Sequence, residues 1–113
     1  MDLEQIIFVI ITSSGDAKSY CMEAMAFARN NEFIKAKEYI KKAEKELLKA
    51  HGQQTDLIQK EAGGKKTEVS LLMVHAQDHL MNAITVKDLS KEMIHMYEKM
   101  YLKDDEYASN VNM

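Results

Sequence analysis

Three polar residues stand close together in the most apolar stretch of this 113-residue chain. They are His75, Asp78 and His79, at relative positions i, i+3 and i+4. At about 100° per residue on a helix, the second histidine lies about 40° to one side of the first and the aspartate about 60° to the other. The sequence therefore predicts a polar patch on one face of an otherwise apolar helix.

Three interpretations fit this patch. A neutral imidazole nitrogen is a nucleophile, so His75 suits phosphoryl or proton transfer tuned by Asp78 and His79. Histidine and carboxylate side chains at this spacing can instead share a metal ion, although one helix supplies only part of a ligand set. A satisfied polar contact in a helix interface would use the same residues without any chemistry. The pattern alone leaves all three open.

The composition narrows the class of protein that holds this patch. The chain has no proline, only four glycines, 46% hydrophobic residues and a net charge of −3. These values favour a single helical domain and give no basic footprint for nucleic acid. One cysteine cannot form an internal disulfide or a cysteine-based zinc cluster, which fits a reducing compartment.

Helical periodicity divides the chain into three segments. The first runs from Leu3 to Ala28, the second from Ala36 to Ile58, and the third from about Glu68 to Tyr101. We expect Asn30 and Asn31 to end the first helix and cap the second, and Thr67 to cap the third after a loop at 62–66. The prediction is an all-α, elongated antiparallel three-helix bundle in residues 1–102, followed by a disordered polar tail in residues 103–113.

The third segment is too apolar for a helix that buries one side only. Of the 18 residues from Val69 to Val86, 11 are apolar, and Asp78 carries the only formal charge. Apolar residues fall nearly all round such a helix, which indicates burial on more than one side. We therefore expect this helix to form a subunit interface as well as part of the core.

The remaining candidates have ordinary explanations. Cys21 lies on the apolar stripe of the first segment and is predicted to be a core residue. His51 and His95 are predicted to be surface or packing residues. The apolar run Ile6–Ile11 is far shorter than the roughly 20 residues that a membrane span needs. An export signal carries basic residues near its start, whereas this chain has Asp2 there. We therefore expect a soluble cytoplasmic protein without membrane insertion.

Two stretches of the sequence closely resemble a known family. They are Gln59–Gly64 and Glu68–Met81, the second containing the string His-Ala-Gln-Asp-His-Leu-Met. Both resemble the enzyme IIA component of the lactose/cellobiose (chitobiose) class of bacterial sugar phosphotransferase systems. The similarity extends over roughly residues 5–101, with Lys18 where the family more usually has arginine.

The resemblance implies specific roles for the polar patch. His75 matches the residue that accepts a phosphoryl group from the phosphocarrier protein HPr and passes it to a cysteine of enzyme IIB, which works with the membrane enzyme IIC. His79 and Gln77 match further residues of that active site. Members of the family are homotrimers with nine helices, and Asp78 matches the residue whose three copies share one divalent ion, usually Mg²⁺.

The sequence thus supports a leading hypothesis and an alternative from another class. The leading hypothesis is a phosphocarrier with phosphotransferase activity for the uptake of a disaccharide such as cellobiose, chitobiose or lactose. The alternative is a non-catalytic helical interaction or regulatory module on the same scaffold. The retention of His75, Asp78 and His79 together favours the phosphocarrier.

Overall fold

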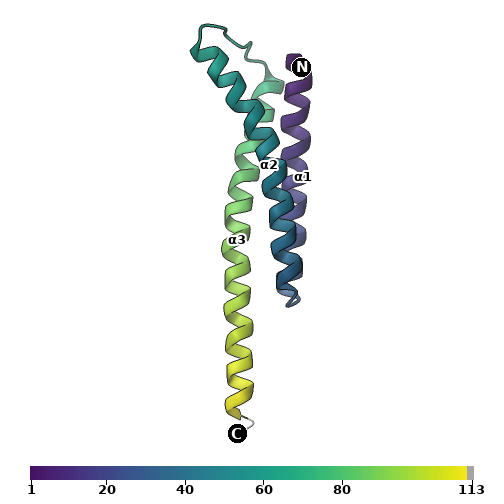
Figure 1. The fold of residues 1–113 in the computed structure, drawn as a ribbon, viewed down its shortest axis with the longest axis vertical. Helices are drawn as coiled ribbons and strands as arrows, with labels where there is room; N and C mark the ends of the chain where they lie inside the picture. The colour runs from purple at the N-terminus through teal and green to yellow at the C-terminus, as the bar shows by residue number, and fades with distance from the viewer. Residues whose placement is uncertain (112–113) are drawn as a thin grey trace.

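The computed structural model describes residues 1–111 and contains three helices in that range, with no strand. Helix α1 spans Leu3–Arg29, α2 spans Phe33–Ala62 and α3 spans Leu71–Val111. Each helix runs antiparallel to the one before it, so α1 and α3 point the same way (Figure 1). The molecule measures 70 × 20 × 20 Å. The predicted all-α, elongated three-helix architecture is therefore confirmed.

Local signals at both ends of α1 explain its bounds. The side chain of Asp2 accepts a hydrogen bond from the backbone N–H of Gln5, whose own side chain accepts one from the backbone of Asp2. This reciprocal pair satisfies two N–H groups that a helix start leaves free. At the other end, Asn31 adopts a positive φ of 64° and turns the chain towards α2. The predicted stop at the asparagines is confirmed, but the residue before α2 is Glu32, which makes no side-chain cap.

The start of α3 differs from the prediction. Residues 65–70 are not helical, and α3 begins at Leu71 rather than near Glu68. The hydroxyl of Ser70 accepts a hydrogen bond from the backbone N–H of Met73 at 3.1 Å, so Ser70 and not Thr67 caps this helix. Both residues are good caps by type, and periodicity could not choose between them.

The end of α3 also differs from the prediction. The helix continues through residues 103–111, where the sequence led us to expect a disordered tail. These residues are fully exposed and include neither proline nor glycine, so nothing stops the helix from propagating out of its packed segment. Residues 112–113, the rest of the predicted tail, lie outside the described range.

The core follows the apolar stripes that define each helix. Small side chains dominate where α1 faces its neighbours, because Ala17, Cys21, Ala24 and Ala28 have no exposed surface. Larger residues such as Leu80 fill the space on α3. The predicted core position of Cys21 is confirmed. None of the described helices combines the length and the apolar character needed to cross a membrane.

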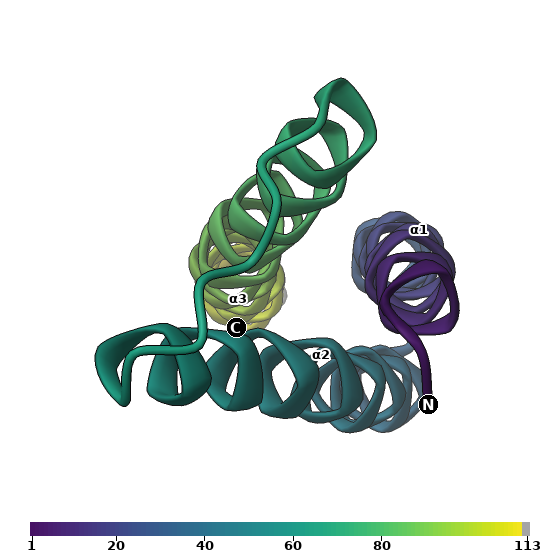
Figure 2. The same ribbon diagram turned by 90° about the horizontal axis from the view of Figure 1, so that it is seen from above.

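Helices α2 and α3 diverge towards the end of the molecule that holds the connecting loop (Figures 1 and 2). Seen along the bundle, the three helices form a triangle, and the loop crosses the open side between α2 and α3 (Figure 2). Helix α2 is in looser contact with α3 than with α1, and a groove lies along the seam of α2 and α3.

One face of α3 is left without a neighbour among residues 1–111. Its exposed residues are mostly apolar, and we call this surface the free face: Leu71, Val74, Met81, Leu89, Met93, Met96 and Met100, with Asp78 among them. An exposed surface rich in apolar residues is typical of an interaction site. The free face is the second apolar side that the sequence predicted for this helix.

Candidate functional site

The two histidines of the predicted patch lie together near the start of α3. Their ring centroids are 4.7 Å apart, and the rings meet edge to face. The imidazole of His75 is exposed, whereas His79 is half-buried against the bundle. One turn of helix separates them, so the backbone of α3 alone sets this geometry. His75 is therefore the histidine that an approaching molecule meets first.

The surroundings of His79 favour its uncharged form. Burial is the largest cause that lowers its pKa below the ordinary value of 6.5, followed by the positive charge of Lys18 and by His75. The charge of Asp78 opposes these effects but does not cancel them. Within the described residues, Nδ1 of His79 is buried and has no hydrogen-bond partner. The other ring nitrogen, Nε2, is thus the atom left for outside contacts.

Asp78 points away from the bundle on the free face of α3. Its Oδ2 accepts a hydrogen bond from Nδ2 of Asn82 at 3.4 Å, and the rest of the carboxylate is exposed. Among residues 1–111 of one chain, no three His, Cys, Asp or Glu side chains are grouped so that they could hold a metal ion. A single chain therefore supplies one oxygen ligand group here and not a metal site.

Gln77 lies on the other side of α3 from His75. Two residues along a helix correspond to a rotation of about 200°, which turns this side chain towards α2. There its Oε1 accepts a hydrogen bond from Nε2 of Gln54, and its own Nε2 lies 3.9 Å from Sδ of Met73. The structure thus brings His75 and His79 together but separates Gln77 from them within one chain.

Two residues near the site were not predicted from the sequence as site residues. Lys18 on α1 contributes to the low pKa of His79, and its only signal was a departure from the family's arginine. Gln54 on α2 contacts Gln77, and its only signal was its place within residues 5–101, over which the sequence resembles the family. Both contacts join helices far apart in sequence, so no local pattern could reveal them.

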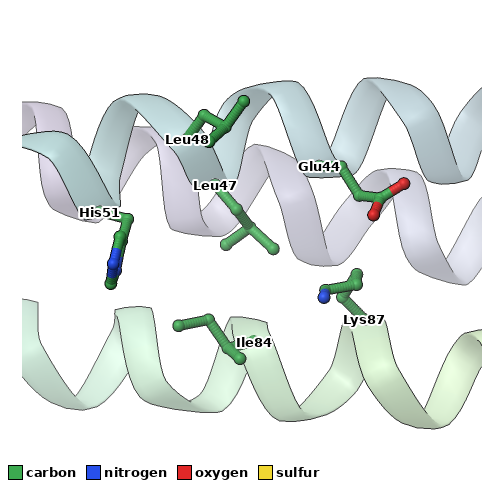
Figure 3. Close-up of a pocket in the computed structure, with 6 residues that line it drawn as sticks. All are labelled: Glu44, Leu47, Leu48, His51, Ile84 and Lys87. Carbon is green, nitrogen blue, oxygen red and sulfur yellow. The ribbon is translucent and has the colours of Figure 1, made fainter.

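The two other candidate histidines lie along the seam of α2 and α3, apart from His75. One groove there has a volume of about 340 Å³, with the ring of His51 at one end and the side chains of Glu44 and Lys87 at the other (Figure 3). Leu47 and Ile84 line its middle (Figure 3). His95 lines a second, smaller groove further along the seam. These positions agree with the predicted packing or surface roles.

Comparison with known proteins places this fold and site in a family. Residues 5–98 match the family model described as "PTS system, Lactose/Cellobiose specific IIA subunit". The lichenan-specific phosphotransferase enzyme IIA component of Bacillus subtilis is 56% identical over 99 residues, covering 88% of this chain and 90% of that protein. The N,N'-diacetylchitobiose-specific EIIA component of Escherichia coli is 38% identical, covering 88% and 85%.

Solved structures give the same result. The cellobiose-specific enzyme IIA of Bacillus anthracis superposes with a TM-score of 0.87 at 51% identity, covering 91% of this chain and 95% of that one. The IIA(Chitobiose) chain from a complex with HPr of Escherichia coli has a TM-score of 0.78 at 37% identity, covering 89% and 98%.

The molecule is thus a three-helix component of a sugar phosphotransferase system, and the chain belongs to the lactose/cellobiose-specific IIA family. The class expected from the sequence, a phosphotransferase carrier, is confirmed.

Proposed function

We propose that the chain accepts a phosphoryl group from phospho-HPr on His75 and passes it to a cysteine of enzyme IIB, in the cytoplasm. The observation that carries this proposal is the exposed imidazole of His75, held edge to face against a half-buried His79. A relative that superposes on this chain has been solved in complex with HPr, which supports the same donor here.

The proposed reaction consists of two exchanges of the phosphoryl group. In the first, an unprotonated nitrogen of His75 attacks phosphorus, a new N–P bond forms, and the N–P bond on HPr breaks. The donor imidazole leaves with that electron pair and takes up a proton. In the second, a thiolate of enzyme IIB attacks phosphorus and an S–P bond forms. The N–P bond of His75 breaks, and its imidazole leaves with that electron pair and takes up a proton. Such transfers depend mainly on positioning and on stabilising the charge of the phosphoryl oxygens.

His79 suits a supporting role in this transfer. Its lowered pKa keeps the ring uncharged near neutral pH, so the ring carries one N–H. Because Nδ1 is buried, a proton on Nε2 is the donor available to a phosphoryl oxygen. The hydrogen bond would stabilise the charge that His75 gains on phosphorylation.

The free face of α3 supports the proposed homotrimer. This face would bury its apolar side chains against the equivalent helices of two other copies. The assembly also offers Gln77 a role, because a side chain on the opposite face of α3 from His75 can serve the His75 of a neighbouring subunit. The nine-helix body of the family corresponds to this arrangement.

Asp78 suits the proposed shared ion. It is an exposed carboxylate within an apolar surface, and three such charges brought together would repel one another. Oxygen ligands of this type suit a hard cation such as Mg²⁺, with one ion shared by three copies of Asp78. When bound, the ion would neutralise this repulsion at the centre of the assembly.

The sugar is proposed only as a class. Membrane enzyme IIC selects it, and disaccharides such as cellobiose, chitobiose or lactose fit the family. The relatives named for lichenan and cellobiose support a cellobiose-type sugar.

Phosphorylation of single-residue variants tests the central proposal. Incubation with phosphoenolpyruvate, enzyme I and HPr should label the wild type and should not label His75→Ala. The matched control is His95→Ala, which removes an exposed histidine elsewhere on α3 and should keep the label. Label that persists in His75→Ala would contradict the assignment, and an unlabelled wild type would favour a non-catalytic helical module.

The variant Asp78→Leu tests the metal proposal separately. We expect it to lose the bound divalent ion, measured by elemental analysis after purification in magnesium, while its sedimentation stays that of a trimer. The reason is that the apolar free face remains intact. Wild-type protein without stoichiometric metal, or a monomeric variant, would contradict this expectation.

A further inference from the structure

The oxygen and the nitrogen of the Gln77 side-chain amide have different hydrogen-bond partners. Its Oε1 accepts a hydrogen bond from Nε2 of Gln54, so the oxygen is engaged. Among residues 1–111, its Nε2 has only Sδ of Met73 as a partner, at 3.9 Å, and sulfur is a weak acceptor. The N–H end of this amide is therefore the end with unused hydrogen-bonding capacity.

A glutamine side chain has nearly the same shape when its amide turns by 180°, so hydrogen-bond partners decide which end faces which way. Here Gln54 donates to the oxygen end of Gln77, and the sulfur of Met73, a weak acceptor, lies beside the nitrogen end. Gln54 is itself half-buried on α2, between the buried residues Ala50 and Leu57 one turn away on either side. Its backbone is thus fixed by the core, which keeps the Gln54 amide within reach of Gln77.

We propose that Gln54 is a positioning residue, which fixes the amide of Gln77 so that its N–H group is free to donate to a phosphoryl oxygen. The inference rests on the proposed function, in which Gln77 serves a phosphorylated histidine. Phosphoryl oxygens accept hydrogen bonds and do not donate them when ionised, so only the N–H end of Gln77 can stabilise them. Gln54 acts through Gln77 and does not itself touch the phosphoryl group.

Two substitutions at position 54 reverse or keep the direction of this hydrogen bond. Gln54→Glu offers only acceptors, so Gln77 should turn, donate to the carboxylate and present its oxygen outwards. Gln54→Lys offers only donors, so Gln77 should keep its orientation. The matched control is Gln53→Glu, which places the same charge on the neighbouring half-buried residue of α2.

The measurement is the single-turnover rate of phosphoryl transfer from phospho-HPr. We expect Gln54→Glu to slow transfer at saturating donor by about tenfold, as the loss of one charge-assisted hydrogen bond would. Gln54→Lys and Gln53→Glu should stay within about twofold of the wild type by the same reasoning. Equal losses in Gln54→Glu and Gln54→Lys, or no loss in either, would overturn the proposal.

A double-substitution cycle separates positioning from a purely structural role. In a Gln77→Leu background, Gln54→Glu should slow transfer no further, because the residue through which it acts is gone. A full additional loss there would show that Gln54 acts on its own. If neither wild type nor any variant is labelled at His75, the proposed function fails first and the positioning role with it. A labelled wild type with insensitive position-54 variants removes the positioning role alone.

Discussion

At the scale of single residues, the site depends on unequal burial of two neighbouring histidines. His75 and His79 share the same helix and the same turn, but one ring is exposed and the other is sheltered. Their sequence spacing places them together, and packing against α1 makes them different. The proposed nucleophile, His75, therefore lies beside a ring whose lowered pKa favours its uncharged form.

The lone cysteine gives a residue-scale prediction about pH. Burial is the largest cause that raises the pKa of Cys21 above its ordinary value of 9.0, and a side-chain hydrogen bond with Ser90 opposes it. The unfolded chain therefore releases the thiol proton at a lower pH than the folded chain does. By linkage, this contribution to stability is complete below about pH 9 and is lost as the pH rises above it.

The measurement is urea unfolding of the wild type and of Cys21→Ala. We expect the difference in unfolding free energy between them to shrink from about pH 8 to about pH 10, by at most about 1.4 kcal/mol per pH unit. The variant controls for lysine and tyrosine titration, which both proteins share. A difference that stays constant or grows with pH would contradict the assigned shift.

At the scale of elements, the third helix, α3, holds all four of the predicted site residues. It supplies His75, Asp78, Gln77 and His79, and it presents different faces to α1, to α2 and to the outside. The register of α3 against the other two helices therefore decides which of its residues face α1, which face α2 and which face outwards. That register is anchored at the start of the helix, where the loop from α2 ends at Ser70.

Removal of the cap tests this anchor. Ser70→Ala should lower the free energy of unfolding by about 1 kcal/mol, because the backbone N–H of Met73 loses its partner. Thr67→Ala is the control and should change stability by less than about 0.5 kcal/mol, since Thr67 lies in the loop before the helix. Urea unfolding followed by circular dichroism compares the two. A larger loss in Thr67→Ala would show that the helix begins earlier than Leu71.

At the scale of the whole molecule, a single bundle leaves part of its apolar surface uncovered. One side of α3 carries exposed apolar residues and the carboxylate of Asp78, and α2 diverges from α3 at the loop end (Figure 1). A chain of this length has little room for an enclosed cavity. A site on the surface of an elongated bundle therefore needs residues from other chains to enclose it. Other copies of the chain and protein partners can supply those residues.

A charge on the free face tests the proposed assembly. Met81→Lys should convert trimers to monomers, because a lysine in an apolar interface loses its hydration without gaining a partner. Ile34→Lys is the control, since Ile34 is also an exposed apolar residue but lies at the start of α2 rather than on α3, and it should leave the trimer intact. Sedimentation equilibrium distinguishes one from three copies of the 13.0 kDa chain. A monomeric wild type, or a trimeric Met81→Lys, would contradict the proposal.

The sequence by itself determined the features that repeat along one helix. These are the three helical segments, the buried stripe through Cys21 and the polar patch from His75 to His79, because periodicity and spacing are local properties. Only the tertiary structure decided which cap begins α3, which imidazole is sheltered and what holds Gln77. Each of these depends on contacts between segments far apart in the chain, such as Gln54 with Gln77. A local sequence pattern does not predict such long-range contacts.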